Sequence, residues 1–163
     1  MGGQNQRVRQ AFFGRPQDSF VPGGAHVAVY VVPIFAGELL VFDVDAPGVR
    51  GRWLPWTVLE YGANPYETAA ALGDDWCEGA VSALEVVDVL SFPSELDGWE
   101  LALVFRAELT KRPEGDAQRR PVLAAPEGID AIGPFDPVDL LRWVERGGGG
   151  GPGAGRGADP LVF

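Results

Sequence analysis

The sequence predicts a single α/β domain in which a mixed β-sheet is flanked by helices. Runs of β-branched and aromatic residues indicate buried strands, and two segments begin with the polar residue and proline that start a helix. The predicted order is strand hairpin, strand, helix, strand hairpin, helix, which favours a sheet packed between helices. With 163 residues and 46% hydrophobic content, the chain has enough apolar surface for one such core.

The first two strands are expected to form a hairpin. The run His26–Pro33 is apolar at almost every position, which is typical of a strand buried on both faces. The run Glu38–Val44 follows after a short Ala-Gly turn. Residues 45–51 contain Pro and Gly and are expected to be a loop. That loop leads into a short apolar strand that ends near Glu60.

The central helix is expected from Pro65 to Cys77. Asn64 can cap its first turn, and Glu67 stands where a capping box places a carboxylate. Gly73 lies inside this helix and costs about 1 kcal/mol relative to Ala. The caps therefore predict the start of the helix more firmly than its continuation.

A second hairpin and a second helix complete the domain. The hairpin strands are expected at Ala83–Ser91 and Trp99–Leu109, and a short strand at Val122–Ala124. Asp136 caps the second helix, which is expected to end at Arg146. Alternation on one hairpin strand predicts the residues that face the core: Trp99, Leu101, Leu103, Phe105 and Ala107.

Three regions are expected along the chain. Residues 1–24 form an N-terminal arm with a short strand or packed segment over 8–13, and residues 25–146 form the domain. Residues 147–163 form a Gly-rich tail that is expected to be flexible.

The composition restricts the partners. The chain has 23 acidic and 13 basic residues and a net charge of −10, so nucleic acid and anionic membranes are not expected to bind. A small basic cluster at 111–120 is one place where an anionic small molecule could bind. The one cysteine, Cys77, forms neither an internal disulfide nor a zinc motif. Without a secretion signal or a membrane span, the chain is expected to be cytoplasmic.

The strand, turn and helix around the central cap resemble a known motif. The resemblance lies in the order of certain residues along the chain: Leu54-Pro55, then Glu60, Gly62, Pro65, Glu67 and Ala69. They look like the surroundings of a Nudix box, the loop and helix that hold Mg²⁺ against a diphosphate in Nudix hydrolases. The resemblance covers about residues 25–146 and implies the Nudix-like α/β/α sandwich.

The residues that carry Nudix chemistry match poorly. An ungapped alignment with the box places Ala71 and Leu72 at the Arg-Glu positions, and Asp75 and Trp76 at the paired glutamates. Sliding by one residue places Asp74 and Asp75 on the paired glutamates but leaves alanines at the Arg-Glu positions. The box is therefore degenerate, and the resemblance implies the fold without ordinary hydrolysis.

An acidic cluster remains on the central helix. Asp74 and Asp75 stand four and three residues before Glu78, so on a continued helix they share a face with it. They are candidate ligands for Mg²⁺ or Mn²⁺. The alternative is that they form a solvated helix face on an acidic protein.

Aromatic residues are concentrated near the box. The candidate ligand-binding residues are Trp53, Trp56, Tyr61, Trp76 and Trp99. Such rings favour an apolar or aromatic ligand over a nucleotide phosphate. The alternative is that the rings pack the core.

Three functions follow from these patterns. The first is a Nudix-fold protein without metal-dependent hydrolysis that needs no cofactor. It binds an apolar or aromatic small molecule or transforms it by acid-base chemistry at Glu60, Glu67 or Asp75. The second is a Mg²⁺- or Mn²⁺-dependent hydrolase of nucleoside diphosphate derivatives that uses the relocated acidic cluster. The third is a non-catalytic interaction domain that binds a protein partner or forms a homodimer.

Overall fold

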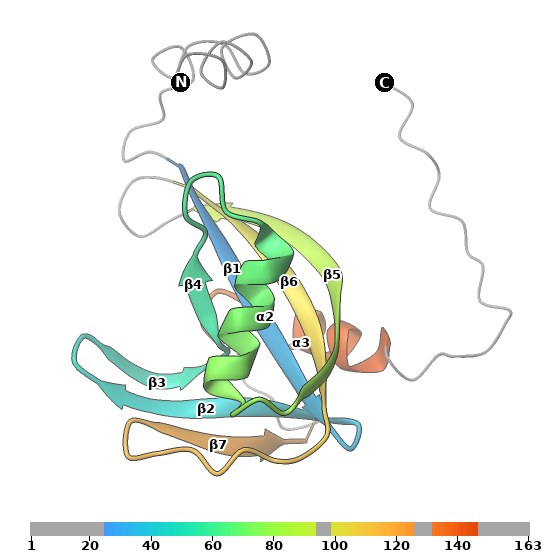
Figure 1. The fold of residues 1–163 in the computed structure, drawn as a ribbon. Helices are drawn as coiled ribbons and strands as arrows, with labels where there is room; N and C mark the ends of the chain where they lie inside the picture. The colour runs from blue at the N-terminus through green and yellow to red at the C-terminus, as the bar shows by residue number, and fades with distance from the viewer. Residues whose placement is uncertain (1–24, 94–98, 126–131, 147–163) are drawn as a thin grey trace, which may run out of the picture.

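The computed structural model describes residues 25–93, 99–125 and 132–146. Within these ranges, seven strands form one mixed sheet, and two helices cover opposite faces of it (Figure 1). The strands are β1 (Ala25–Phe35), β2 (Glu38–Ala46), β3 (Val49–Trp53), β4 (Trp56–Val58), β5 (Val81–Pro93), β6 (Trp99–Leu109) and β7 (Arg119–Ala124). The helices are α2 (Pro65–Trp76) and α3 (Pro137–Glu145). The predicted α/β class is confirmed, whereas the arm 1–24 and the tail 147–163 lie outside the described residues.

The centre of the sheet is the parallel pair of β1 and β6. Their register runs from Ala25 opposite Trp99 to Ile34 opposite Glu108. Val29 and Val31 on β1 pack beneath α2, while the intervening Tyr30 packs on the α3 side. Because successive side chains of a strand point to opposite faces, β1 is buried on both sides, as predicted.

The prediction that one face of β6 meets the core was incomplete. Phe105 and Ala107 pack beneath α2, as expected. The alternate residues Ala102 and Val104 are also fully buried, in the core beneath α3. The alternation of polar and apolar residues suggested one exposed face, but α3 covers that face as well.

The strand β2 leaves the central sheet soon after its hairpin with β1. It pairs with β1 only next to the turn, where Leu39 lies opposite Ile34 and Glu38 opposite Phe35, and then pairs with β3 and β7. This departure leaves room for β4 along the same edge of β1, where Ala28 lies opposite Val58. The Ala-Gly turn has positive φ at both residues, which suits a two-residue hairpin.

The prediction of a loop over residues 45–51 was wrong. β2 extends to Ala46 and β3 begins at Val49, so the Pro-Gly pair is only the turn of a second hairpin. The sequence hides β3 because its residues are mostly exposed and show no apolar alternation. Backbone pairing with β2 and an ion pair between Arg52 Nε and Asp43 at 3.1 Å hold it in place.

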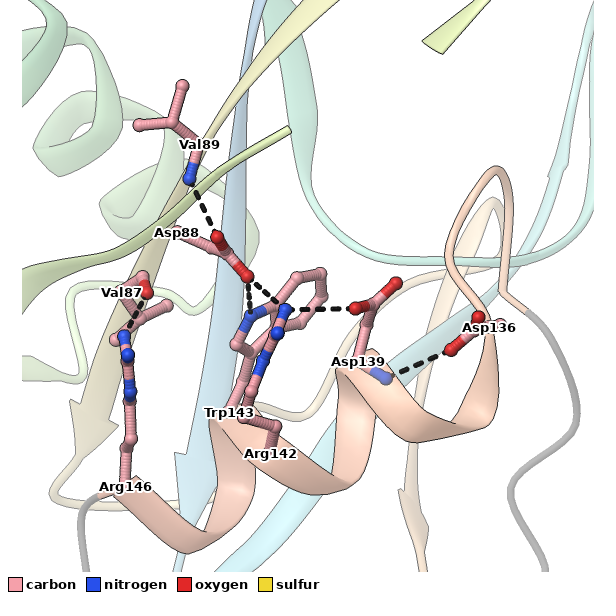
Figure 2. Close-up of polar contacts among 8 residues, drawn as sticks. All are labelled: Val87, Asp88, Val89, Asp136, Asp139, Arg142, Trp143 and Arg146. Carbon is pink, nitrogen blue, oxygen red and sulfur yellow. Dashed lines mark hydrogen bonds and ion pairs between the residues drawn. The ribbon is translucent and has the colours of Figure 1, made fainter. Parts of the chain in front are cut away.

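Polar side chains attach α3 to the sheet (Figure 2). Asp88 on β5 accepts a hydrogen bond from Trp143 Nε1 at 2.9 Å and forms an ion pair with Arg142. The buried Arg106 on β6 donates from Nε to the Trp143 carbonyl at 3.1 Å. Asp136 caps the start of the helix, as predicted, by accepting from the Asp139 N–H.

We predict that Asp88→Ala lowers the free energy of unfolding by about 1–3 kcal/mol, because the Trp143 indole N–H then has no acceptor. Urea denaturation measures the change. Glu85→Ala on the same strand removes an exposed carboxylate and is the matched control. Equal stability of the two variants would show that Asp88 does not anchor α3.

Candidate functional site

The start of α2 has the predicted cap. The Asn64 side chain accepts from the N–H groups of Tyr66 and Glu67 at 2.9 and 3.3 Å, and Pro65 has no N–H to satisfy. The N–H and the hydroxyl of Thr68 both donate to the Asn64 carbonyl. All backbone donors of the first turn are therefore satisfied within the chain.

Gly73 lets α2 lie close to the sheet. A Cβ at this position would stand 3.1 Å from Val81 Cγ2 and 3.9 Å from Val31 Cγ1. The intrinsic cost of a mid-helix glycine is therefore offset by close packing on β1 and β5. The flanking Ala69 and Leu72 are buried on the same face, so packing determines which residues of α2 face away from the sheet.

The end of α2 separates Glu78 from the other acidic residues. The helix ends at Trp76 with Cys77 as its C-cap, and Glu78 has φ 55°. The expected helical spacing therefore does not extend to Glu78. Its carboxylate instead accepts from the backbone N–H groups of Glu114 and Gly115, at 2.7 and 3.3 Å, and anchors the loop before β7.

Asp75 is paired with Arg119, the first residue of β7. Arg119 Nη1 lies 2.9 Å from Asp75 Oδ2, and its guanidinium lies 4.8 Å from the centre of the Trp76 ring. Asp74 is exposed on the adjacent position of α2. In the described ranges, no three His, Cys, Asp or Glu side chains come together closely enough to hold one metal ion.

The arginines of the predicted basic cluster also have partners. Arg120 lies 3.5 Å from an oxygen of Asp43, and Arg112 donates to the Pro121 carbonyl at 3.1 Å. With Arg119 paired to Asp75, these three cations contact acceptors of their own chain. These contacts tie residues 111–120 to α2, β2 and β7.

An open groove lies between β4 and α2. Its volume is about 380 Å³, and it is lined by Thr57, Val58, Glu60, Ala63, Thr68, Ala71 and Leu72. Of the predicted catalytic residues, Glu60 lines the groove, whereas Glu67 and Asp75 do not. A larger hollow of about 630 Å³ lies at the β2–β3 turn. It is lined by the turn residues Pro47 and Gly48 and by the strand residues Asp45, Ala46 and Arg50, of which Asp45 and Arg50 form an ion pair with each other.

The predicted aromatic residues do not line this groove. Trp76 meets Phe42 edge-to-face at 5.1 Å, and Trp56 packs against the core beneath α3. Trp53 lies 6.3 Å from Trp56, measured between ring centres, and donates to the Arg50 carbonyl. Trp99 is half-buried at the start of β6, and Tyr61, next to Glu60, is 77% exposed.

Sequence reasoning missed most residues of the groove. Thr68, Ala71 and Leu72 are neutral, so nothing in their chemistry marked them. Their spacing contained a signal, because residues three and four apart share one side of a helix. Counting from the Asn64 cap would have placed them together.

Neither helix in the described part of the chain is long and apolar enough to cross a membrane.

Cys77, the C-cap of α2, is fully buried in a cluster with Leu40 and Phe42 of β2. Burial, together with the nearby charges of Asp74 and Glu78, raises the pKa of its thiol to about 12. We predict no reaction with a disulfide reagent at about pH 8 unless the chain unfolds, because the thiolate is the reactive form.

The same shift predicts an alkaline loss of stability. The pKa of the thiol is higher in the folded than in the unfolded chain. The contribution of the buried, protonated thiol to the free energy of unfolding is therefore complete below about pH 8.5 and is lost as the pH rises toward about 12. Thermal unfolding of the wild type and of Cys77→Ala across this range measures it. Parallel curves for the two proteins would contradict the prediction.

No protein-family profile and no curated protein matches this sequence. Its fold, however, matches many solved structures. The MutT protein from Methanosarcina mazei Go1 has a TM-score of 0.61 at 13% identity, with 77% of this chain and 96% of that chain covered. A NUDIX hydrolase from Nitrosomonas europaea has a TM-score of 0.60 at 13% identity, with 76% and 90% covered.

A third similar structure is the NUDIX domain of Shewanella oneidensis NrtR in complex with ADP ribose. Its TM-score is 0.60 at 10% identity, with 85% of this chain and 96% of that domain covered. At such identities the likeness concerns the arrangement of strands and helices. The shared architecture is the mixed sheet between α2 and α3. This chain has the Nudix fold.

Proposed function

We propose that this chain is a Nudix-fold protein that binds a small apolar or aromatic molecule in the groove between β4 and α2, without metal-dependent hydrolysis. The composition of the groove wall carries the proposal. α2 contributes Thr68, Ala71 and Leu72 to it, and Val58 and Ala63 add further apolar surface. Thr57 and Glu60 add polar groups, and a concave wall that combines apolar side chains with a small number of polar groups is typical of small-molecule sites.

The side chains of α2 are a poor fit to a divalent cation. Mg²⁺ needs several oxygen ligands in near-octahedral geometry, and Nudix hydrolases supply them from helix carboxylates. Here Asp75 is paired with Arg119, and Glu78 binds two backbone N–H groups beyond the helix. Recruiting either carboxylate for a metal would break these contacts, which supports a function without a metal cofactor.

Phosphate chemistry is also poorly supported by the charges. All three similar structures described above are named as MutT or NUDIX proteins, and the NrtR domain is in complex with ADP ribose. Within the described residues, no Lys, Arg or His lines the groove of this chain. A bound diphosphate would therefore lack a counter-charge there.

Glu60 is the one charged residue among the described residues that line the groove. In the proposed function it orients the ligand through a polar group. If the protein is an enzyme, Glu60 is also its proton donor or acceptor. The partner is thus a small molecule, and cytoplasmic location is part of the proposal.

We predict no hydrolysis of nucleoside di- and triphosphates, dinucleoside polyphosphates or nucleotide sugars with Mg²⁺ or Mn²⁺. Chromatography of the nucleotide products measures it, because cleavage of a diphosphate bond in every one of these substrates yields a shorter nucleotide. The competing function is a hydrolase that uses Asp74, Asp75 and Glu78. Turnover near 1 per second that is lost in Asp75→Asn would establish that function instead, because this is an ordinary enzymatic rate.

We predict that the protein binds the neutral fluorescent probe N-phenyl-1-naphthylamine, and that Ala71→Phe weakens binding at least tenfold by filling the groove. Ala71 is exposed, so the larger side chain is compatible with folding. Ala70→Phe introduces the same ring at the neighbouring position, outside the groove lining, and is the control. Equal loss in both variants, or no binding by the wild type, would contradict a ligand in this groove.

A further inference from the structure

We infer that the ligand of the β4–α2 groove carries a cationic amine on its apolar body. The inference rests on the proposed function and adds the charge of the ligand to it. It follows from the hydrogen-bonding groups that the groove offers and from those that the chain has already used.

The polar side chains of the groove are mainly acceptors. Glu60 offers a carboxylate, which only accepts when ionised. The Thr68 hydroxyl donates its hydrogen to the Asn64 carbonyl at 2.9 Å, which leaves its oxygen lone pairs for a ligand. The Thr57 hydroxyl can donate or accept. A ligand that matches this set supplies N–H donors.

The start of α2 offers no site for an anion. A helix N-terminus attracts phosphate through unpaired backbone N–H groups. In α2 the first residue is Pro65, and the N–H groups of Tyr66 and Glu67 are already bound by Asn64. The Glu67 carboxylate adds negative charge to this first turn. The end of α2 nearest the groove therefore offers an anion no free backbone donor.

The basic side chains that could balance an anion are engaged elsewhere. Arg119 pairs with Asp75, and Arg120 pairs with Asp43 on β2. Neither lines the groove. The net charge of −10 adds an overall field that attracts cations and repels anions.

The apolar part of the groove accommodates the rest of the ligand. Val58, Ala63, Ala71 and Leu72 form a wall on which a ring system can lie. Glu60 comes from the segment between β4 and α2, so its carboxylate can meet an amine at the edge of that wall. The complementary molecule is an aromatic or aliphatic body with an ammonium group at one end.

The test compares three probes of one shape and different charge. These are tryptamine, which is cationic at pH 7, the neutral alcohol tryptophol and the anion indole-3-acetate. Isothermal titration calorimetry of the full chain at low salt measures each affinity. The expected order is tryptamine, then tryptophol, then indole-3-acetate, with at least fivefold between the cation and the neutral probe.

Two variants connect the charge preference to Glu60. Glu60→Gln should weaken tryptamine about fivefold and leave tryptophol unchanged, because only the charge is removed. Glu38→Gln removes an exposed carboxylate outside the groove lining and should change neither affinity by more than about twofold, since an exposed charge that does not contact the ligand interacts with it only weakly through water.

The outcomes separate the two proposals. Equal binding of the three probes, or an order that Glu60→Gln does not change, would overturn the charge preference and leave an apolar groove. Tighter binding of indole-3-acetate would overturn it as well. Failure of all three probes, together with failure of the neutral naphthylamine, would reject the groove itself.

Discussion

The parallel pairing of β1 and β6 is the constraint on which the structure depends. Both strands carry large apolar side chains on both faces, so each face of the sheet must be covered. α2 covers one face and α3 the other (Figure 1). The departure of β2 toward β3 and β7 then leaves an edge of β1 open to β4, and the groove forms where β4 meets α2.

The packing of α2 on this pair determines what its remaining residues can do. Ala69, Leu72 and Gly73 face the sheet, and Gly73 has room for no larger side chain without displacing Val81. The helix therefore cannot rotate freely. Its other sides are directed to the groove, through Ala71, and to the start of β7, through the ion pair between Asp75 and Arg119. This division separates the apolar groove from the charged end of the helix.

The opposite helix is attached by different interactions. α3 buries Trp143, but it also depends on hydrogen bonds from Trp143 and Arg142 to Asp88 (Figure 2). Arg106 on β6 donates a hydrogen bond to the Trp143 carbonyl in the last turn of α3. None of these residues lines the groove, so the contacts that attach α3 are distinct from those proposed to bind a ligand. An exposed groove residue such as Ala71 can therefore change while α3 remains attached.

The sequence by itself determined the features that depend on neighbouring residues. The cap at Asn64, the cap at Asp136 and the β1–β2 turn were predictable because local hydrogen bonds and backbone conformations select them. Only the tertiary structure decided the β2–β3 hairpin, the second buried face of β6 and the partners of the acidic residues. Glu78, for example, lies beyond the helix and binds a loop 36 residues away in the chain. Such contacts depend on segments that folding brings together, and a single sequence carries no local signal for them.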